Sequence, residues 1–328
     1  MKTKAFLLLS VALAACAPRA TLIASPQFPA VQVPAGYHIE KMVGDLTYPT
    51  SVAWDDQGRM YVLEAGGAFN DEASPARILR VENGGATEVV NLKPKGLMAS
   101  AVGLAWYQGA FYVTHRAMDG TDAVSRVTPD GQVTQLFSGI GDGRSEHQIN
   151  DIRVGPDGRM YVAVGPAGNS AVMGIDNAPF VKMYPDAHTS TCQDIVLTGR
   201  NFETPDFRTP DQNDKARTGA FVPFGTETTP GQVIKGTNKC GGAILAFDPA
   251  NPEASLKPYA WGLRNVIGMA WNRQGEMLAA VNGYDIRGSR PVKDKYDATY
   301  RIRPGAWYGW PGLCCLNWPQ GRRRAGVV

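Results

Sequence analysis

Four segments of the chain share one arrangement of apolar and polar positions: an apolar run, a polar turn ending in glycine, and a second apolar run. They cover residues 51–62, 102–113, 152–164 and 267–281, with turn glycines at Gly58, Gly109, Gly158 and Gly275. Two apolar runs joined by such a turn predict a β-hairpin. The first three glycines lie 109 − 58 = 51 and 158 − 109 = 49 positions apart, a period typical of propellers and solenoids. The pattern therefore predicts a repeat protein.

Further pairs of apolar runs lie between the hairpins, at residues 77–81 with 87–91, 124–127 with 132–137, and 243–247 with 256–261. Each unit then supplies four strands, which is the content of a propeller blade. A fourth unit closes with runs at residues 298–302 and 307–311, and an early strand is expected near Tyr37. We therefore expect an all-β propeller over residues 36–311, with about four blades plus one early strand.

The N-terminus predicts export. Lys2 and Lys4 precede an apolar run, residues 5–14, that is too short to cross a bilayer as a mature helix. The run ends in Leu-Ala-Ala-Cys16, which resembles the bacterial lipobox, whose cysteine is acylated; the alternative is an ordinary signal peptide in which Cys16 is incidental. Ala17, in place of Asp, favours the outer membrane. This predicts a lipid-anchored protein on the periplasmic side, with residues 17–35 as a tether and no other membrane contact.

Residues 166–242 interrupt the third unit with a stretch rich in Pro, Thr, Asp and Asn. Long insertions of this kind are usually functional or irregular, so we expect an elaborated loop over one face, forming a wall of a substrate cleft. Cys192 and Cys240 bracket most of it. Export permits disulfides, so the two either staple the ends of this loop or remain separate buried thiols.

The pattern stops after residue 311. Residues 312–328 contain Cys314, Cys315 and a run of three arginines, without strand alternation. A basic C-terminal run is commonly a solvated tail. Four blades are too few for the ring that the repeat predicts, so we favour a truncated chain that ends in out-of-register sequence.

The composition is consistent with an all-β fold and argues against nucleic-acid binding. The 37 glycines and 23 prolines suit many short strands joined by tight turns. The formal charge is only +3, and Lys and Arg are spread along the chain. Because no continuous basic stripe is present, we set nucleic-acid binding aside.

The chain has four histidines, and one of them, His147, precedes a predicted inner strand. His147 lies at the start of the third unit's inner strand, where a propeller presents side chains to its central opening. A histidine there is suited to accept a proton near neutral pH, although a histidine bonded to a neighbouring blade is an equally simple interpretation. His38 and His115 resemble strand-edge residues and His188 lies in the insertion, so none of these three is assigned a role.

Two further segments carry polar groups at corresponding places in the fourth unit. Arg264 and Asn265 precede its inner strand and could orient a carboxylate or planar anion, or form a salt bridge between blades. The turn at residues 282–285 offers main-chain and side-chain oxygens of the kind that Ca²⁺ binds, but Asn-Gly is foremost a turn dipeptide. Zinc-type Cys/His spacing, a phosphate-binding glycine loop and a Gly-x-Ser-x-Gly elbow are absent from the sequence.

Together these segments resemble the soluble glucose/sorbosone dehydrogenase family of quinoproteins. The resemblance is carried, in order, by His147-Gln148, the sequence GPDGRMY at residues 155–161, GLRNVIG at 262–268, NGYD at 282–285 and YGWP at 308–311. It covers roughly residues 36–311. The stretch at residues 285–292 is closer to the sorbosone-type branch than to the glucose-type branch.

The resemblance implies a six-bladed propeller that holds pyrroloquinoline quinone (PQQ) and Ca²⁺ and oxidises a sugar or sugar aldehyde, passing electrons to a quinone or cytochrome acceptor. His147 would be the general base, and Arg264 would stabilise charge on the quinone oxygen. Arg264 would also bind the cofactor with Asn265 and Gln148. The carbonyls of Gly283 and Tyr284 would bind Ca²⁺.

Two departures from the family pattern stand out. Pro166 replaces the carboxylate that orients the histidine in the glucose-type branch, and Met98 replaces a glutamine that contacts the cofactor. Residues that grip the three cofactor carboxylates from the last blades also have no counterpart, which weakens the expected binding. Two alternatives therefore stay open: an inactive propeller that binds a ligand, and a Ca²⁺-dependent lactonase-like hydrolase.

Overall fold

The computed structural model describes residues 21–23, 31–68, 73–211, 213–312 and 316–317, in two units, Met1–Gly44 and Asp45–Val328. In the first unit, β1 (Thr21–Ile23) pairs antiparallel with β2 (Val31–Val33), so the expected tether contains a strand pair. The strand expected near Tyr37 is wrong, because residues 34–48 contain none. Cys16, Cys314 and Cys315 lie outside the described residues.

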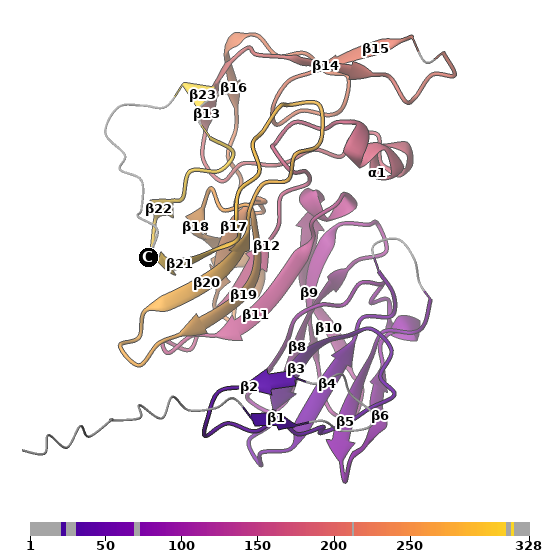
Figure 1. The fold of residues 1–328 in the computed structure, drawn as a ribbon, viewed down its shortest axis with the longest axis vertical. Coiled ribbons are helices and arrows are strands. Elements are labelled where there is room, and N and C mark those ends of the chain that lie inside the picture. The colour runs from indigo at the N-terminus through magenta and orange to yellow at the C-terminus, as the bar shows by residue number, and fades with distance from the viewer. Residues whose placement is uncertain (1–20, 24–30, 69–72, 212, 313–315, 318–328) are drawn as a thin grey trace, which may run out of the picture. The chain divides into compact units, whose positions relative to one another are not determined.

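The second unit consists of consecutive antiparallel sheets, which Figure 1 shows side by side. Blade 1 contains β3 (Pro49–Trp54), β4 (Met60–Glu64), β5 (Arg77–Glu82) and β6 (Gly85–Asn91). Blade 2 contains β7 (Leu104–Tyr107), β8 (Ala110–Arg116), β9 (Asp122–Val127) and β10 (Val133–Ile140). Blade 3 contains β11 (Ile149–Val154), β12 (Met160–Val164), β17 (Ala243–Phe247) and β18 (Lys257–Trp261). Blade 4 contains β19 (Asn265–Trp271), β20 (Met277–Asn282) and β21 (Ala298–Ile302). The predicted all-β fold of about four propeller blades is confirmed.

The four predicted hairpins are the inner strand pairs of the four blades, and their turn glycines share one conformation. Gly58, Gly109, Gly158 and Gly275 have φ between 74° and 77°, a region that favours glycine. In blades 1, 3 and 4 the glycine N–H donates to the carbonyl three residues earlier, while blade 2 uses a two-residue loop. The repeat in the sequence is thus a repeat of backbone geometry.

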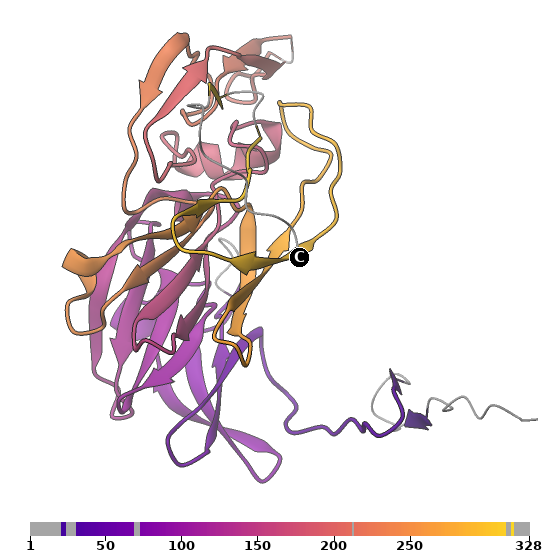
Figure 2. The ribbon, with the colours of Figure 1, turned by 90° about the vertical axis from the view of Figure 1, so that its left-hand side faces the viewer.

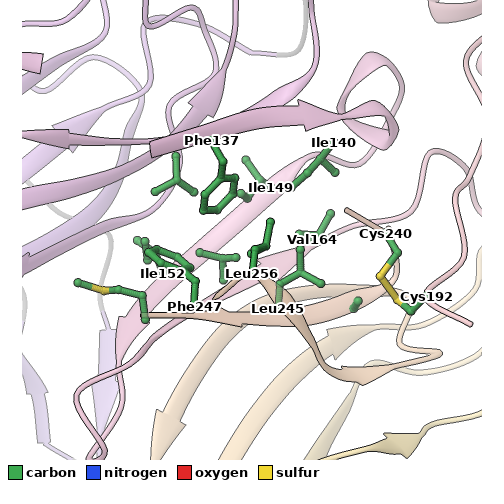
Figure 3. Close-up of a cluster of buried hydrophobic side chains, with 14 of the residues drawn as sticks. Phe137, Ile140, Ile149, Ile152, Val164, Cys192, Cys240, Leu245, Phe247 and Leu256 are labelled. Carbon is green, nitrogen blue, oxygen red and sulfur yellow. A yellow bond between two sulfur atoms is a disulfide. The ribbon is translucent and has the colours of Figure 1, made fainter. Parts of the chain in front are cut away.

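Each blade buries both faces, because successive strand residues point to opposite sides. We call the face toward the next blade in sequence the forward face and the opposite one the rear face. The inner strands lie side by side in series, β3 against β7, β7 against β11 and β11 against β19. Three apolar clusters fill the three spaces between consecutive blades. Figure 3 shows part of the cluster between blades 2 and 3, with Phe137 of β10 edge-on to Phe247 of β17.

The end of the fourth unit differs from the prediction. The run expected as its last strand contains β22 (Ala306–Trp307), which pairs in parallel with β18 of blade 3. Main-chain bonds from Tyr308 to Trp261 and from Trp310 to Gly262 continue that alignment. Within the described residues the fourth sheet therefore has three strands, because the closing segment crosses to the preceding blade.

The insertion is more ordered than its composition indicates. It contains β13 (Ile195–Thr198) paired with β16 (Pro230–Ile234), β14 (Phe202–Pro205) paired with β15 (Lys215–Thr218), and helix α1 (Ala178–Met183). Figure 1 and Figure 2 show these elements gathered beyond one end of the blade strands. Two apolar clusters lie mainly within it, one around Phe221 and one around Phe224. The segment thus has small cores of its own.

The remaining elements are short. They are the helix α2 (Pro252–Ser255), the 3₁₀ turns η1 (Lys93–Lys95), η2 (Gly141–Arg144) and η3 (Ile175–Asn177), and β23 (Leu316–Asn317), which pairs with β13. In the part of the chain that is described, no helix has the length and apolar character needed to cross a bilayer.

A disulfide joins Cys192 to Cys240, with 5.1 Å between the Cα atoms. Both residues are buried at the edge of the cluster between blades 2 and 3, as Figure 3 shows. The bond therefore joins an interior point of the insertion, at Cys192, to its C-terminal end at Cys240, beside the blade core.

Replacing both cysteines with serine should lower the free energy of unfolding by about 3–4 kcal/mol, because the bond closes a loop of 48 residues. Urea denaturation of the oxidised protein and of the double variant measures the difference. Reduction should bring the wild type to the level of the variant and leave the variant unchanged; equal stability of the oxidised wild type and the variant would contradict this account.

Candidate functional site

His147 lies between η2 and β11, at the entrance of blade 3. Its Nδ1 is 3.0 Å from the main-chain carbonyl oxygen of Pro166. A carbonyl only accepts hydrogen bonds, so Nδ1 carries the proton and Nε2 keeps its lone pair. Pro166 stands where the glucose-type branch has an orienting carboxylate, and here its main-chain carbonyl contacts the imidazole instead.

The imidazole is almost enclosed, with a side chain only 10% exposed. Burial lowers the pKa of His147 to about 4; the nearby Glu146 acts against this shift, while Arg264 and Arg287 reinforce it. His147 is therefore neutral near pH 7. A neutral imidazole with its proton on Nδ1 keeps a basic lone pair at Nε2.

Glu146 stands beside this base but faces a different partner. Its Oε1 is 3.3 Å from Nε2 of His147, and its carboxylate accepts two hydrogen bonds from the Arg287 guanidinium. Paired N–H donors fix a carboxylate in orientation as well as position. Arg287 thus holds the acidic group that lies next to the histidine.

Arg287 also binds two other carboxylates. Its Nη1 is 2.9 Å from Asp176 and its Nε is 3.1 Å from Asp285. Burial opposes the charge of Arg287, but the hydrogen bonds to Glu146 and then to Asp285, together with the charge of Asp176, raise its pKa above the ordinary value. The residue comes from the loop between β20 and β21 and connects that loop to the entrance of blade 3 and to the insertion.

Arg264 lies at the entrance of blade 4 with only 6% of its side chain exposed. Its Nη2 is 2.8 Å from Asp285, and its Nε donates to Asn169 of the insertion at 3.1 Å. The interactions run from His147 through Glu146, Arg287 and Asp285 to Arg264. The two residues singled out as candidate catalytic groups are thus brought to one site.

Three asparagines connect the entrances of blades 3 and 4. Asn150 donates to the side chain of Asn265 at 2.7 Å, and Asn265 donates to Asn282 at 3.0 Å. Gly165 makes the approach possible: a Cβ there would lie 2.5 Å from the Cβ of His147 and 2.6 Å from Oδ1 of Asn265. The absence of a side chain at position 165 therefore lets His147 and Asn265 lie next to each other.

The predicted calcium ligands Gly283 and Tyr284 line a cavity of about 110 Å³ that Arg264 also borders. The carbonyl of Tyr284 accepts the main-chain N–H of Lys295 at 3.1 Å. The N–H of Gly283 donates to Asp297 at 2.9 Å. Among the described residues, no three His, Cys, Asp or Glu side chains are grouped as metal ligands would be.

The other candidates lie elsewhere. Gln148 accepts a hydrogen bond from Arg116 of β8 at 3.2 Å, so its side chain faces blade 2, and the Met98 main chain bridges to Arg116 as well. His115 is not at a strand edge as expected: it is fully buried in β8 and bonded to Ser125. His38 is exposed, and His188 is exposed in the insertion.

Sequence reasoning missed the residues that join the site together: Asp176, Asn169 and Arg287. Arg287 lies in a stretch that the family resemblance highlighted, but its partners are 111 and 141 positions away. A hint was available for Asn169, since a Gly-Asn-Ser turn at the start of an insertion is a common place for polar side chains. Its contact with Arg264 follows only from the folded chain.

One family model covers slightly more than half of the chain: residues 25–193, or 193 − 25 + 1 = 169 of 328, match the family described as "Domain of unknown function (DUF7133)". The chain belongs to this family. Its description gives no activity. No curated protein sequence matches the chain.

Two of the solved structures to which the chain is similar illustrate the shared fold. The first is the PQQ-bound aldose sugar dehydrogenase from Streptomyces coelicolor, at 17% identity and a TM-score of 0.53 over 88% of this chain and 69% of that one. The second is a putative oxidoreductase (glucose dehydrogenase) from Thermus thermophilus, at 18% identity and a TM-score of 0.52 over 88% of this chain and 72% of that one. At such identities the likeness concerns the fold.

The pKa of His147 should respond in opposite directions to loss of its two charged neighbours. Glu146→Gln removes a carboxylate that favours the imidazolium, so the pKa should fall below about 4. Arg287→Met removes a cation that disfavours it, so the pKa should rise. Histidine ring NMR titration measures both, and His147→Gln assigns the signal among only four histidines. Shifts of the same sign would contradict the geometry.

His147 should also make the protein less stable in acid. The unfolded chain binds a proton near pH 6.5 and the folded chain only near pH 4, so stability is complete above pH 6.5 and falls between these values. The loss is (6.5 − 4) × 1.36, or about 3 kcal/mol. The difference in unfolding free energy between wild type and His147→Gln should shrink by about this amount from pH 7 to pH 4, since all other groups are common to both. A constant difference would contradict the low pKa.

Proposed function

We propose that this protein is an oxidoreductase of the quinoprotein type, which uses PQQ to oxidise a sugar or sugar aldehyde. One observation carries the proposal: a buried, neutral histidine with a fixed tautomer is connected to the buried Arg264 by one network of charged side chains, at adjacent blade entrances. The shared fold with two sugar dehydrogenases supports this interpretation. The motifs at residues 262–268 and 308–311 support the same family, and residues 285–292 favour its sorbosone-type branch.

The donor set fits the quinone oxygens of the cofactor. Arg264 is a buried guanidinium and Asn265 an amide at the entrance of the same strand, and both supply fixed N–H groups. Arg264 also borders the cavity of about 110 Å³, which Tyr284, Tyr308 and Trp310 line; His147 and Asn265 lie outside this lining, so the cavity can take only part of the ring system. When bound, the quinone would accept the hydride from the substrate carbon.

The charged side chains described at this site do not by themselves neutralise the cofactor. Glu146, Asp176 and Asp285 provide three negative charges, against two positive charges on Arg264 and Arg287. A cofactor with three carboxylates needs further cations, and Lys295 at the cavity is one of them. Binding of PQQ would therefore exchange at least the Arg264–Asp285 pair for a contact between Arg264 and the cofactor.

His147 would act as the general base. Its Nε2 takes the proton of the substrate hydroxyl, and the Pro166 carbonyl stabilises the imidazolium through the Nδ1 proton. Glu146, next to Nε2, stabilises the same charge. Arg287 keeps this carboxylate in place, so that both partners of the imidazolium are preorganised before the substrate arrives.

Gly283 and Tyr284 would supply main-chain oxygens to a Ca²⁺ ion, a donor type that this cation favours. We further propose that the protein acts on the periplasmic side of the envelope, anchored by a lipid on Cys16, with a quinone or cytochrome as its electron acceptor. These parts of the proposal rest on sequence motifs at residues 13–17 and 282–285.

Purified protein titrated with PQQ and Ca²⁺, then supplied with aldoses or sugar aldehydes and an artificial acceptor, should reduce the acceptor only when PQQ is present. His147→Gln should lower kcat by about 10²–10⁴-fold, the usual contribution of a general base. His38→Gln, at an exposed site, is the matched control and should leave kcat unchanged.

Two further measurements in that experiment separate its steps. Quenching of tryptophan fluorescence by PQQ reports binding without turnover, and removal of Ca²⁺ with EGTA should weaken it. Absence of PQQ binding by the wild type in the presence of Ca²⁺ would refute the proposal. Turnover that His147→Gln leaves intact would refute the role of this histidine alone.

A further inference from the structure

The main-chain carbonyl that faces His147 belongs to a peptide unit whose other end is also bound. This unit joins Pro166 to Ala167, and in a trans peptide the carbonyl and the N–H point in opposite directions. The carbonyl oxygen of Pro166 is 3.0 Å from Nδ1 of His147, and the N–H of Ala167 donates to Oδ1 of Asp142 at 3.0 Å. One planar group therefore lies between a carboxylate and the imidazole.

Asp142 lies in η2 and is fully buried. Besides the bond from Ala167, its carboxylate accepts hydrogen bonds from the main-chain N–H and the hydroxyl of Ser190, in the interior of the insertion. Gly241, near the end of the insertion, lies so close that a Cβ there would be 2.1 Å from Oδ1 of Asp142. Three points of the insertion thus meet at one buried carboxylate.

The backbone at residues 165–167 is also held without this carboxylate. The N–H of Gly165 donates to the carbonyl of Gln148 at 3.0 Å, and the N–H of Glu146 donates to the carbonyl of Ala167 at 3.3 Å. These two bonds lie on either side of the histidine, so they should keep this backbone in place when the charge of the carboxylate is removed. What the carboxylate adds at this point is its charge.

We propose that Asp142 is a positioning residue for His147 and acts through the peptide unit between Pro166 and Ala167. A charged acceptor at the N–H end makes the carbonyl oxygen more negative, because linked hydrogen bonds polarise one another. The more negative oxygen holds the imidazole proton on Nδ1 more strongly and keeps the lone pair on Nε2. That this imidazole is a catalytic base rests on the proposed function, but the effect of Asp142 on its tautomer does not.

NMR of the imidazole nitrogens and their protons, recorded on the protein without PQQ or sugar, tests this. Asp142→Asn keeps the shape of the side chain and removes its charge. The ratio of the Nδ1–H to the Nε2–H tautomer of His147 should fall by about 3- to 10-fold, the effect of one hydrogen bond on an equilibrium.

Asp151→Asn is the matched control. Asp151 is also buried and accepts a main-chain N–H, from Met269 at 2.8 Å, but it does not bind the peptide unit beside the histidine. This variant should lower stability and leave the tautomer ratio unchanged. A folded Asp142→Asn protein with the wild-type ratio, or an equal change in both variants, would overturn the proposal.

Titration of the wild type is a second test, which does not depend on a variant that folds. Burial raises the pKa of Asp142 to about 6 and lowers the pKa of His147 to about 4, so between these values the carboxylate loses its charge while the imidazole stays neutral. The tautomer ratio should therefore change with a midpoint near pH 6. Asp122 and His188 also interact with the Asp142 carboxylate, and Asp122→Asn and His188→Gln should each retain this transition. A ratio that stays constant from about pH 7.5 to about pH 5 would contradict the role of Asp142.

Discussion

The packing of one sheet face on the next organises this protein. A blade of four short strands buries too little surface alone, so both of its faces need a neighbour. The chain provides these neighbours by repeating one unit. In every unit the strand residues on either side of the glycine turn alternate between the same two sheet faces. Stability is therefore shared between adjacent units, and the inner strands are brought side by side with their entrances at one end.

The candidate site is a product of that arrangement. Three carboxylates and two guanidinium groups meet where the entrances of blades 3 and 4 lie next to the insertion. A buried ion such as Arg264 needs a partner of opposite charge, and the pairs at this site link different segments of the chain. The network thus does two tasks: it fixes the insertion and the loop after β20 to the blades, and it sets the electrostatic surroundings of His147.

Much of the fold could be predicted from the sequence, because alternation and turn glycines are local signals. The hairpins around Gly58 and Gly158 follow from them directly. The predictions that failed concern contacts between residues far apart in the sequence. The run after Ile302 has the pattern of a closing strand, but its β22 pairs with β18, a choice made by contacts of Trp307 and Trp310 far from their own blade. The small cores of the insertion were likewise hidden by its polar composition.

The main-chain carbonyl beside His147 has a consequence for how this site tolerates change during evolution. An orienting carboxylate is lost when a single codon mutates, whereas every amino acid possesses a carbonyl oxygen, so the tautomer of the imidazole does not depend on which side chain occupies position 166. It depends instead on the path of the backbone leaving β12, which Gly165 constrains. Purifying selection should accordingly act on the glycine and leave its successor comparatively free to drift.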